Sequence, residues 1–245
     1  MQRGGQLLVA ARGRAQLSAP RPLASAPQSA VQGYATTVEA LPEWAKDLPP
    51  QWQAAAKPGS SYRRKMKLHF DRIDVDGNGT VEWDDIEQII MAYVIIRQLR
   101  PGTPEFEALY EGHRFVFANF WSPNKDLTGQ CTYDDMIRNM ILANNAGLWK
   151  NMDEFVEKTP VKMTFALVDA DGDGTISPRE FMEFWQAHKL KQEECRPVFE
   201  ELDTDKSGII TREEYHAAFF NWFTTPHADE GHGPGKNLWG IVPSA

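Results

Sequence analysis

The sequence predicts an all-α fold in which four helix–loop–helix units form two pairs. Three observations predict it: acidic twelve-residue segments recur along the chain, apolar residues at helical spacing flank them, and the composition suits a packed core. Of the 245 residues, 42% are hydrophobic and 11% are aromatic, which argues against a disordered chain. The formal net charge of −8 argues against binding nucleic acid through its phosphates.

The N-terminal segment differs from the rest of the chain in charge. Its first 38 residues contain no acidic residue and four arginines, Arg3, Arg12, Arg14 and Arg21. Arginine-rich, serine-containing and acid-free N-termini are typical of mitochondrial transit peptides. We therefore expect residues 1–37 to be removed on import into the matrix. The alternative is a cytoplasmic protein whose N-terminal segment is not a targeting signal. The proline-punctuated residues 38–60 are expected to be a linker.

Three segments share one pattern of oxygen-bearing side chains: residues 74–85, 169–180 and 203–214. Oxygen donors stand at positions 1, 3 and 5, glycine at 6, an aliphatic residue at 8 and a carboxylate at 12. This pattern is the calcium loop of an EF-hand. Ca²⁺ takes six to eight oxygens, which alternate positions of a tight loop bring together, while position 7 offers its carbonyl and glycine permits the bend. The expected ligands are Asp74, Asp76, Asn78, Thr80 and Asp85, then Asp169, Asp171, Asp173, Thr175 and Glu180, then Asp203, Asp205, Ser207, Ile209 and Glu214.

Helices are expected on both sides of each loop. Apolar residues at spacing i, i+4, i+7 precede the loops, for example Met66, Phe70 and Ile73 before the first, and this is the stripe of an amphipathic helix. Ser177 with Glu180, and Thr211 with Glu214, form capping-box patterns that start the exiting helices. The aliphatic residues at position 8 are expected to join neighbouring loops by short β-bridges.

A fourth, degenerate loop is expected at residues 124–135, because these hands usually occur in pairs. Gly129 would stand at position 6 and Cys131 at position 8, but position 1 is Asn124 and only two acids remain, Asp126 and Asp135. We expect this weak hand to brace its partner, and the sequence leaves its metal occupancy open. The lobes would then be residues 60–145 and 150–224, with a C-terminal tail at 225–245.

The carboxylate count ranks the sites, since affinity follows ligand charge and loop rigidity. The loop at 169–180 offers four ligand carboxylates and the other two regular loops offer three each. Position 12 of the first loop is Asp85, one methylene shorter than Glu, so Mg²⁺ is expected to compete with Ca²⁺ there.

The chain resembles the group of sarcoplasmic calcium-binding proteins, calexcitin and luciferin-binding proteins over about residues 60–240. The resemblance rests on three features: the segment Tyr62–Phe70 that leads into the first loop, a weak second hand before two strong ones, and the motif Asn237–Gly240 in the tail. The resemblance implies four hands in two lobes packed face to face. Members of the group buffer Ca²⁺ and Mg²⁺, act as calcium-triggered signalling proteins, or carry a luciferin in an apolar cavity.

The expected function is that of a calcium buffer or modest sensor. Two alternatives stay open: a calmodulin-like adaptor that grips target helices with a methionine-rich groove, and a carrier or photoprotein-like oxygenase with an apolar ligand. Only Met136 and Met140 stand four apart on one helix. Five tryptophans could line a cavity, but we expect them to be ordinary core residues: Trp83, Trp121, Trp149, Trp185 and Trp222. No G-x-S-x-G, C-x-x-C or H-E-x-x-H motif occurs, so no enzyme is expected. The longest apolar run, residues 89–96, is too short for a membrane span.

Overall fold

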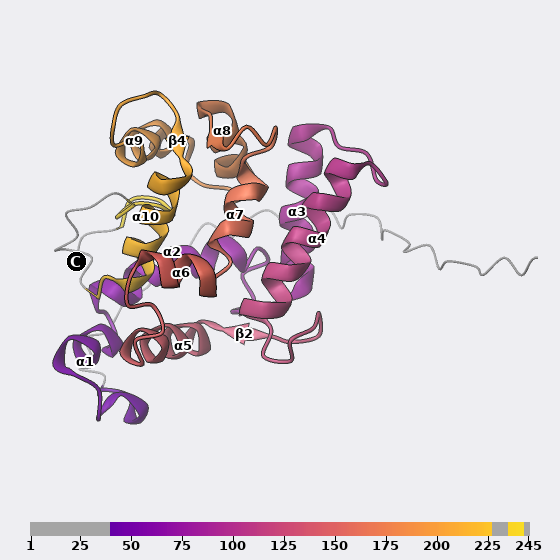
Figure 1. Cartoon of the computed structure of the whole chain (residues 1–245). Helices are drawn as coiled ribbons and strands as arrows, with labels where there is room; N and C mark the ends of the chain where they lie inside the picture. The colour runs from indigo at the N-terminus through magenta and orange to yellow at the C-terminus, as the bar shows by residue number, and fades with distance from the viewer. Residues whose placement is uncertain (1–39, 227–234, 243–245) are drawn as a thin grey trace, which may run out of the picture. The chain divides into compact units, whose positions relative to one another are not determined.

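The computed structural model describes residues 40–226 and 235–242 (Figure 1). The transit peptide expected at residues 1–37 lies outside the described residues. Every described residue belongs to one structural unit, residues 39–245.

Helices and two-residue strands alternate along this unit. The helices are η1 (Glu43–Ala45), α1 (Pro50–Ala56), α2 (Ser61–Ile73), α3 (Trp83–Arg97), α4 (Pro104–Val116), η2 (Phe117–Trp121), α5 (Tyr133–Asn145), α6 (Met152–Lys158), α7 (Val161–Val168), α8 (Pro178–Ala187), α9 (Gln192–Leu202) and α10 (Arg212–Thr224). The strands are β1 (Thr80–Val81), β2 (Cys131–Thr132), β3 (Thr175–Ile176) and β4 (Ile210–Thr211). Here η1 is a 3₁₀ turn and η2 is a π-helical turn. The all-α prediction with short bridges is confirmed.

The strand register pairs the hands as predicted. β1 and β2 are antiparallel with Val81 opposite Cys131, and β3 and β4 are antiparallel with Ile176 opposite Ile210. Each pair thus places the two residues at loop position 8 across from one another. The first and second hands form one pair, and the third and fourth hands form the other.

The exiting helices start with the caps that the sequence predicts. In α8 the Ser177 side chain accepts a hydrogen bond from the Glu180 N–H, and the Glu180 side chain accepts one from the Ser177 N–H. The same reciprocal box starts α10, and a Glu82–Asp85 box starts α3. Because position 12 of each loop is also the third residue of its helix, one carboxylate serves both the cap and the loop.

Residues 38–60, expected to be a linker, instead hold η1 and α1. Two consecutive prolines start α1, which suits the fixed φ of proline at the first helical turn. The side chain of Trp52 is buried together with Ala55 and Ala56, and α1 packs against α2 and α5 (Figure 1). Proline content alone could not reveal that this segment has an apolar face that the first pair of hands covers.

Two further segments near the second pair of hands are ordered in ways the sequence did not predict. Helix α6 lies between the two pairs in the sequence and packs against α7 and α10 of the second pair, and its Phe155 is buried. Residues 235–242, expected to be part of a tail, bury Leu238 and Trp239. The Ile241 N–H donates to Glu194 Oε2 at 3.0 Å, so this part of the tail is held to α9.

Aromatic side chains dominate the interior. The largest fully buried ones are Trp185, Trp222, Tyr62, Tyr93, Tyr215, Phe70, Phe117, Phe155 and Phe181. Within the described residues, no helix is both long enough and apolar enough to cross a bilayer.

Candidate metal centres

Each of the three regular loops begins on a buried aspartate at the end of a helix. The N–H groups of Asp74, Asp169 and Asp203 each donate to the carbonyl four residues earlier, at 2.9 Å. These aspartates therefore end α2, α7 and α9 and fix position 1 of each loop to a rigid helix. All three residues are buried, so their carboxylates face into the loop.

Glycine at position 6 is required by the backbone of each loop. Gly79, Gly174 and Gly208 have φ values of 91°, 89° and 87°, a region that other residues rarely adopt. Their N–H groups donate to the carboxylate at position 1, with distances of 3.0, 3.0 and 2.9 Å. The glycine N–H thus orients the first ligand of its own loop.

The carboxylate at position 12 closes each loop in the same way. In the third loop one oxygen of Glu180 accepts the N–H groups of Ala170 and Asp171, and the other accepts that of Ser177. Glu214 repeats this arrangement in the fourth loop. The shorter Asp85 repeats it in the first loop at similar distances. Position 12 therefore ties the start of the loop to its end.

The structure brings most of the predicted carboxylate ligands together. In each of three groups the carboxylate oxygens lie within 4.8 Å of one another: Asp74, Asp76 and Asp85; Asp169, Asp171 and Asp173; Asp203, Asp205 and Glu214. Like charges this close repel unless a cation lies between them. The buried Oδ1 atom of Asp74 has no hydrogen-bond partner within the described residues, as expected of an atom held for a metal. An all-oxygen set of this kind suits a hard divalent cation.

The remaining predicted donors lie on the same loops. The amide oxygen of Asn78 accepts the N–H of Thr80 at 2.8 Å, and Asp173 does the same for Thr175. Ser207 Oγ donates to the carbonyl of Ile209 at 3.2 Å. Glu180 is the one predicted carboxylate outside its loop's group, although it accepts the same backbone hydrogen bonds as Asp85 and Glu214.

Burial and hydrogen bonding shift the pKa values of these carboxyls in opposite directions. Burial raises the pKa of Asp74 and that of Asp85. Burial would also raise the pKa of Glu214, but hydrogen bonds from Thr211 and Thr204 outweigh it and lower this pKa to about 2. A raised carboxyl pKa indicates that negative charge is less favourable on Asp74 and Asp85 than on Glu214 when no cation neutralises it.

The second loop begins two residues earlier than the sequence predicts. Ser122, not Asn124, follows the last helical turn and is buried. Lys125 has φ of 61° and donates from Nζ to the carbonyl six residues earlier, as Lys206 does at position 4 of the fourth loop, with φ of 63°. Asp126 Oδ1 accepts the Thr128 N–H at 2.8 Å, the bond that joins positions 5 and 7 elsewhere. Positions 1 and 5 are therefore Ser122 and Asp126, while the strand pairing keeps Cys131 at position 8.

The two extra residues of the second loop fold back onto its start. A Cβ on Gly129 would lie 2.2 Å from Ser122 Oγ and 2.7 Å from Pro123 Cδ, and Gly129 has no positive φ. Glycine at position 129 is thus needed because the backbone there lies close to Ser122 and Pro123, and not because the loop bends around a metal. Asp135 accepts hydrogen bonds from Thr132, which cap α5. Among the described residues this loop forms no group of three metal-binding side chains.

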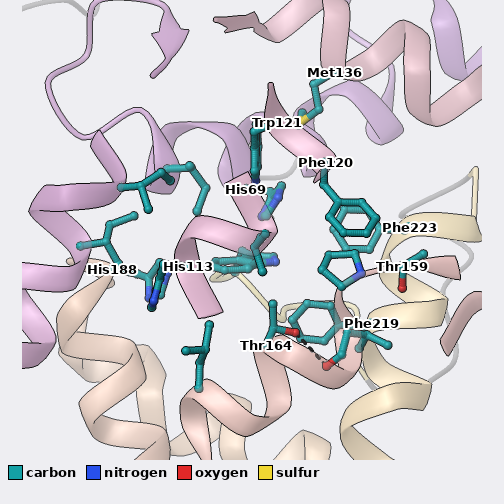
Figure 2. A pocket seen from close by; sticks show the side chains of 18 of the residues that line it. His69, His113, Phe120, Trp121, Met136, Thr159, Thr164, His188, Phe219 and Phe223 are labelled. Carbon is teal, nitrogen blue, oxygen red and sulfur yellow. Dashed lines mark hydrogen bonds between the residues drawn. The ribbon is translucent and has the colours of Figure 1, made fainter. Parts of the chain in front are cut away.

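A cavity of about 160 Å³ lies between the pairs of hands, with mostly apolar walls (Figure 2). Three histidines line it: His69, His113 and His188. Burial lowers the pKa of His69 to about 3 and those of His113 and His188 to about 4, so all three are neutral at pH 7. Sequence patterns did not single them out, because a histidine in a helix gives no local sign of burial.

The methionines considered for an adaptor groove also belong to this interior. Met136 is buried and Met140 is partly buried, and both line the cavity. Of the tryptophans considered for a ligand cavity, Trp121 and Trp149 line it, and Trp239 does so from the C-terminal segment. Trp83, Trp185 and Trp222 pack elsewhere in the core.

Comparison with known proteins agrees with this geometry. A family model described as "EF-hand domain pair" matches residues 158–220, and one described as "EF hand" matches residues 67–91. Obelin from Obelia geniculata is 26% identical over 181 residues, which is 70% of this chain and 89% of obelin.

Two solved structures share the fold. The calcium-loaded apo form of the coelenterazine-binding protein from Renilla muelleri has a TM-score of 0.61 at 22% identity, covering 76% of this chain and all of that one. A sarcoplasmic calcium-binding protein from amphioxus has a TM-score of 0.51 at 16% identity, covering 75% of this chain and 98% of that one. The resemblance inferred from the sequence is confirmed at the level of the fold.

Proposed function

We propose that this EF-hand calcium-binding protein is a non-catalytic calcium buffer or modest sensor that holds Ca²⁺ in three loops. The observation that supports this is the convergence of three carboxylates within 4.8 Å in each of the three regular loops. Buffer and sensor share this chemistry and differ in affinity and in how far the helices open.

In each proposed calcium site the same loop positions supply the ligands. The carboxylate at position 1 is fixed by its helix and by the glycine N–H, positions 3 and 5 turn inward, position 7 supplies its carbonyl, and position 12 closes the cage. In order of position the ligands are Asp74, Asp76, Asn78, Thr80 and Asp85; Asp169, Asp171, Asp173, Thr175 and Glu180; and Asp203, Asp205, Ser207, Ile209 and Glu214. Glu180 would supply position 12 of the third cage, from the same place in its loop as Asp85 and Glu214 in theirs.

Calorimetric titration with Ca²⁺, with and without Mg²⁺, tests the proposal. We expect three ions per chain and the tightest binding at the third and fourth loops. Glu180→Gln should remove the highest-affinity step, whereas Asp85→Ala should remove a weaker one. A titration with fewer than three ions, or one in which Asp85→Ala abolishes the tightest step, contradicts the proposed sites or their ranking.

We also propose that Mg²⁺ occupies the first loop when Ca²⁺ is low. Asp85 is shorter than the glutamates at position 12 of the other loops, so it offers two oxygens to a large ion less readily, and the smaller octahedral Mg²⁺ suffers less from this. In the titration above, Mg²⁺ should weaken calcium binding to the first loop more than binding to the third.

The proposed location is the mitochondrial matrix, on the basis of the arginine-rich and acid-free residues 1–37. The test is a fusion of residues 1–37 to a fluorescent protein, followed by protease protection in isolated mitochondria. The matched control replaces the four arginines with glutamine. Cytoplasmic fluorescence of the unmodified fusion contradicts the proposal.

A second candidate function, transport of an apolar aromatic ligand, has the cavity in its favour. The coelenterazine-binding protein shares the fold, but a cavity of about 160 Å³ is smaller than the roughly 300–1,000 Å³ of sites for drug-sized ligands. It is close to the size of an engineered cavity of about 150 Å³ that binds benzene. Titration with coelenterazine, followed by quenching of the fluorescence of Trp121 and Trp239, tests this candidate. A Thr164→Phe variant, which fills the cavity, should abolish any quenching that comes from ligand bound there.

A further inference from the structure

One arginine of the first hand contacts the third hand on both sides of its metal loop. Arg97 is the last residue of α3, and its side chain is only 11% exposed. Its Nε donates to Glu183 Oε2 at 2.9 Å, and its two terminal nitrogens donate to the carbonyls of Leu167 and Val168 at 2.9 and 3.1 Å. All of these partners belong to the third hand.

The acceptors stand at the two ends of the third loop. Val168 is the last residue of α7 and immediately precedes Asp169, the first proposed ligand. Glu183 lies in α8 one helical turn after Glu180, the last proposed ligand. A single guanidinium therefore contacts both helices whose relative angle sets the geometry of the third loop. Arginine suits this role because its planar fork donates in several fixed directions at once.

The other end of the same helix carries a ligand of the first loop. Asp85 lies in the first turn of α3 and Arg97 in its last, about 18 Å apart at 1.5 Å per residue. The helix between them packs against α8, and the Tyr93 ring lies under the guanidinium at 4.7 Å. Because Asp85 and Arg97 share one helix, any rotation of α3 at the first loop would also move Arg97.

No equivalent contact supports the other regular loops. Among hydrogen bonds between described residues, no side chain donates to the carbonyls of Ile73 or Leu202, which correspond to Val168 in the first and fourth hands. The last two carbonyls of the third hand's entering helix are instead held by a residue from the other pair.

We propose that Arg97 couples the two pairs of hands, so that occupancy of the first loop raises the calcium affinity of the third. This proposal depends on calcium binding by these loops and not on whether the protein is a buffer or a sensor. The coupling is reciprocal, because linkage requires each ion to change the affinity of the other by the same factor.

Loop-resolved titration tests the coupling. The N–H groups of Gly79, Gly174 and Gly208 donate to the first ligand of their own loops, so their NMR signals report each loop separately. The first loop is disabled by Asp76→Ala, because Asp76 is exposed and does not cap a helix. The affinity of the third loop is then compared with and without this change, in the wild-type and in the Arg97→Met backgrounds.

In the wild-type background, Asp76→Ala should weaken calcium binding at the third loop roughly tenfold, within the usual range of allosteric coupling. In the Arg97→Met background the same change should weaken it by no more than about twofold. Arg97→Lys, which keeps the charge but loses the fork, should give an intermediate value. Arg97→Met leaves the buried Glu183 paired only with Arg179. The double variant Arg97→Met/Glu183→Gln also removes this carboxylate and should match Arg97→Met, which separates loss of coupling from the effect of a buried charge that has lost one partner.

Arg196→Met is the matched control, because the exposed side chains of Arg196 and Glu200 pair within α9; this change should leave the tenfold coupling intact. The proposal is overturned if Arg97→Met retains the full coupling, or if the wild-type third loop does not respond to Asp76→Ala. Failure of calcium binding itself would be distinct, because then the Gly79 and Gly174 signals would not respond to calcium at all.

Discussion

The carboxylate of Asp85 accepts the N–H of Val75 at 2.9 Å, so the twelfth residue of the first loop is bonded to the second residue of the same loop. The corresponding bond in the third loop, from the N–H of Ala170 to Glu180, is 2.7 Å long. An aspartate therefore closes its loop as well as a glutamate does. Because the Asp85 side chain is shorter, it can close the loop only if α3 and the loop backbone lie closer together. The same short side chain then extends less far toward an ion.

We predict that Asp85→Glu raises the calcium affinity of the first loop roughly tenfold and weakens Mg²⁺ competition there, because the longer side chain can offer both oxygens to the ion. Titration calorimetry with and without Mg²⁺ measures both effects. The converse change Glu180→Asp is the matched control, and it should make the third loop more sensitive to Mg²⁺. Equal Mg²⁺ sensitivity in Asp85→Glu and the wild type would contradict the explanation.

The second loop should be sensitive to any side chain at Gly129. We predict that Gly129→Ala lowers the free energy of unfolding by about 2 kcal/mol, since the new Cβ would lie 2.2 Å from Ser122 Oγ and overpacking commonly costs that much. Urea unfolding in chelator measures the change. The number of bound calcium ions should stay at three, because this loop supplies none of the sites; loss of an ion would show that the second loop is a working site.

The buried histidines should make the protein sensitive to acid. Burial lowers the pKa of His69 to about 3, against about 6.5 in an unfolded chain. Between these values the unfolded state binds a proton that the folded state does not, so the free energy of unfolding falls as the pH falls from 7 toward 3. For one such histidine the loss between pH 7 and 5 is about 2 kcal/mol.

His69→Phe removes this contribution and leaves no broken hydrogen bond at Nδ1, which has no partner within the described residues. In calcium-depleted buffer the variant should lose about 2 kcal/mol less than the wild type between pH 7 and 5, as measured by urea unfolding. If the two proteins lose stability in parallel, His69 is already protonated in the folded state or is exposed.

Calcium should stabilise the folded chain strongly, because it binds clustered carboxylates that repel one another without it. Each site filled at about 100 times its dissociation constant adds about 2.7 kcal/mol, so the melting temperature should rise by at least about 10 °C. Scanning calorimetry with calcium and with chelator measures the rise, and potassium chloride of equal ionic strength is the control. The same melting temperature in calcium and in chelator would contradict calcium binding to the folded state.

The regular loops could be predicted from the sequence because their geometry is local. Asp169, Gly174 and Glu180 are fixed by bonds within one twelve-residue segment, so residue types at fixed spacing suffice to identify them. The second loop resembled them only in part. Gly129 looked like the bend at position 6, whereas it is there to let the backbone approach Ser122, a contact that spacing alone does not reveal.

Other features depend on contacts between distant segments and left no local pattern. In the sequence Arg97 ends a helix as many surface arginines do. It is buried only because α7 and α8 pack against it in the folded chain. His69 and His188 come together with Trp239 from three separate parts of the chain. Helix α1 forms from a segment rich in proline because a neighbouring surface covers its apolar face.

The folded-back second loop has a consequence for how the first pair of hands works. Gly129 approaches Ser122 closely inside this loop, and its described residues form no group of three metal-binding side chains, so we expect this hand to take its shape without metal. Through β1 and β2 the first loop is paired with this hand. A single cation should then complete the first pair of hands, whereas the second pair should need two.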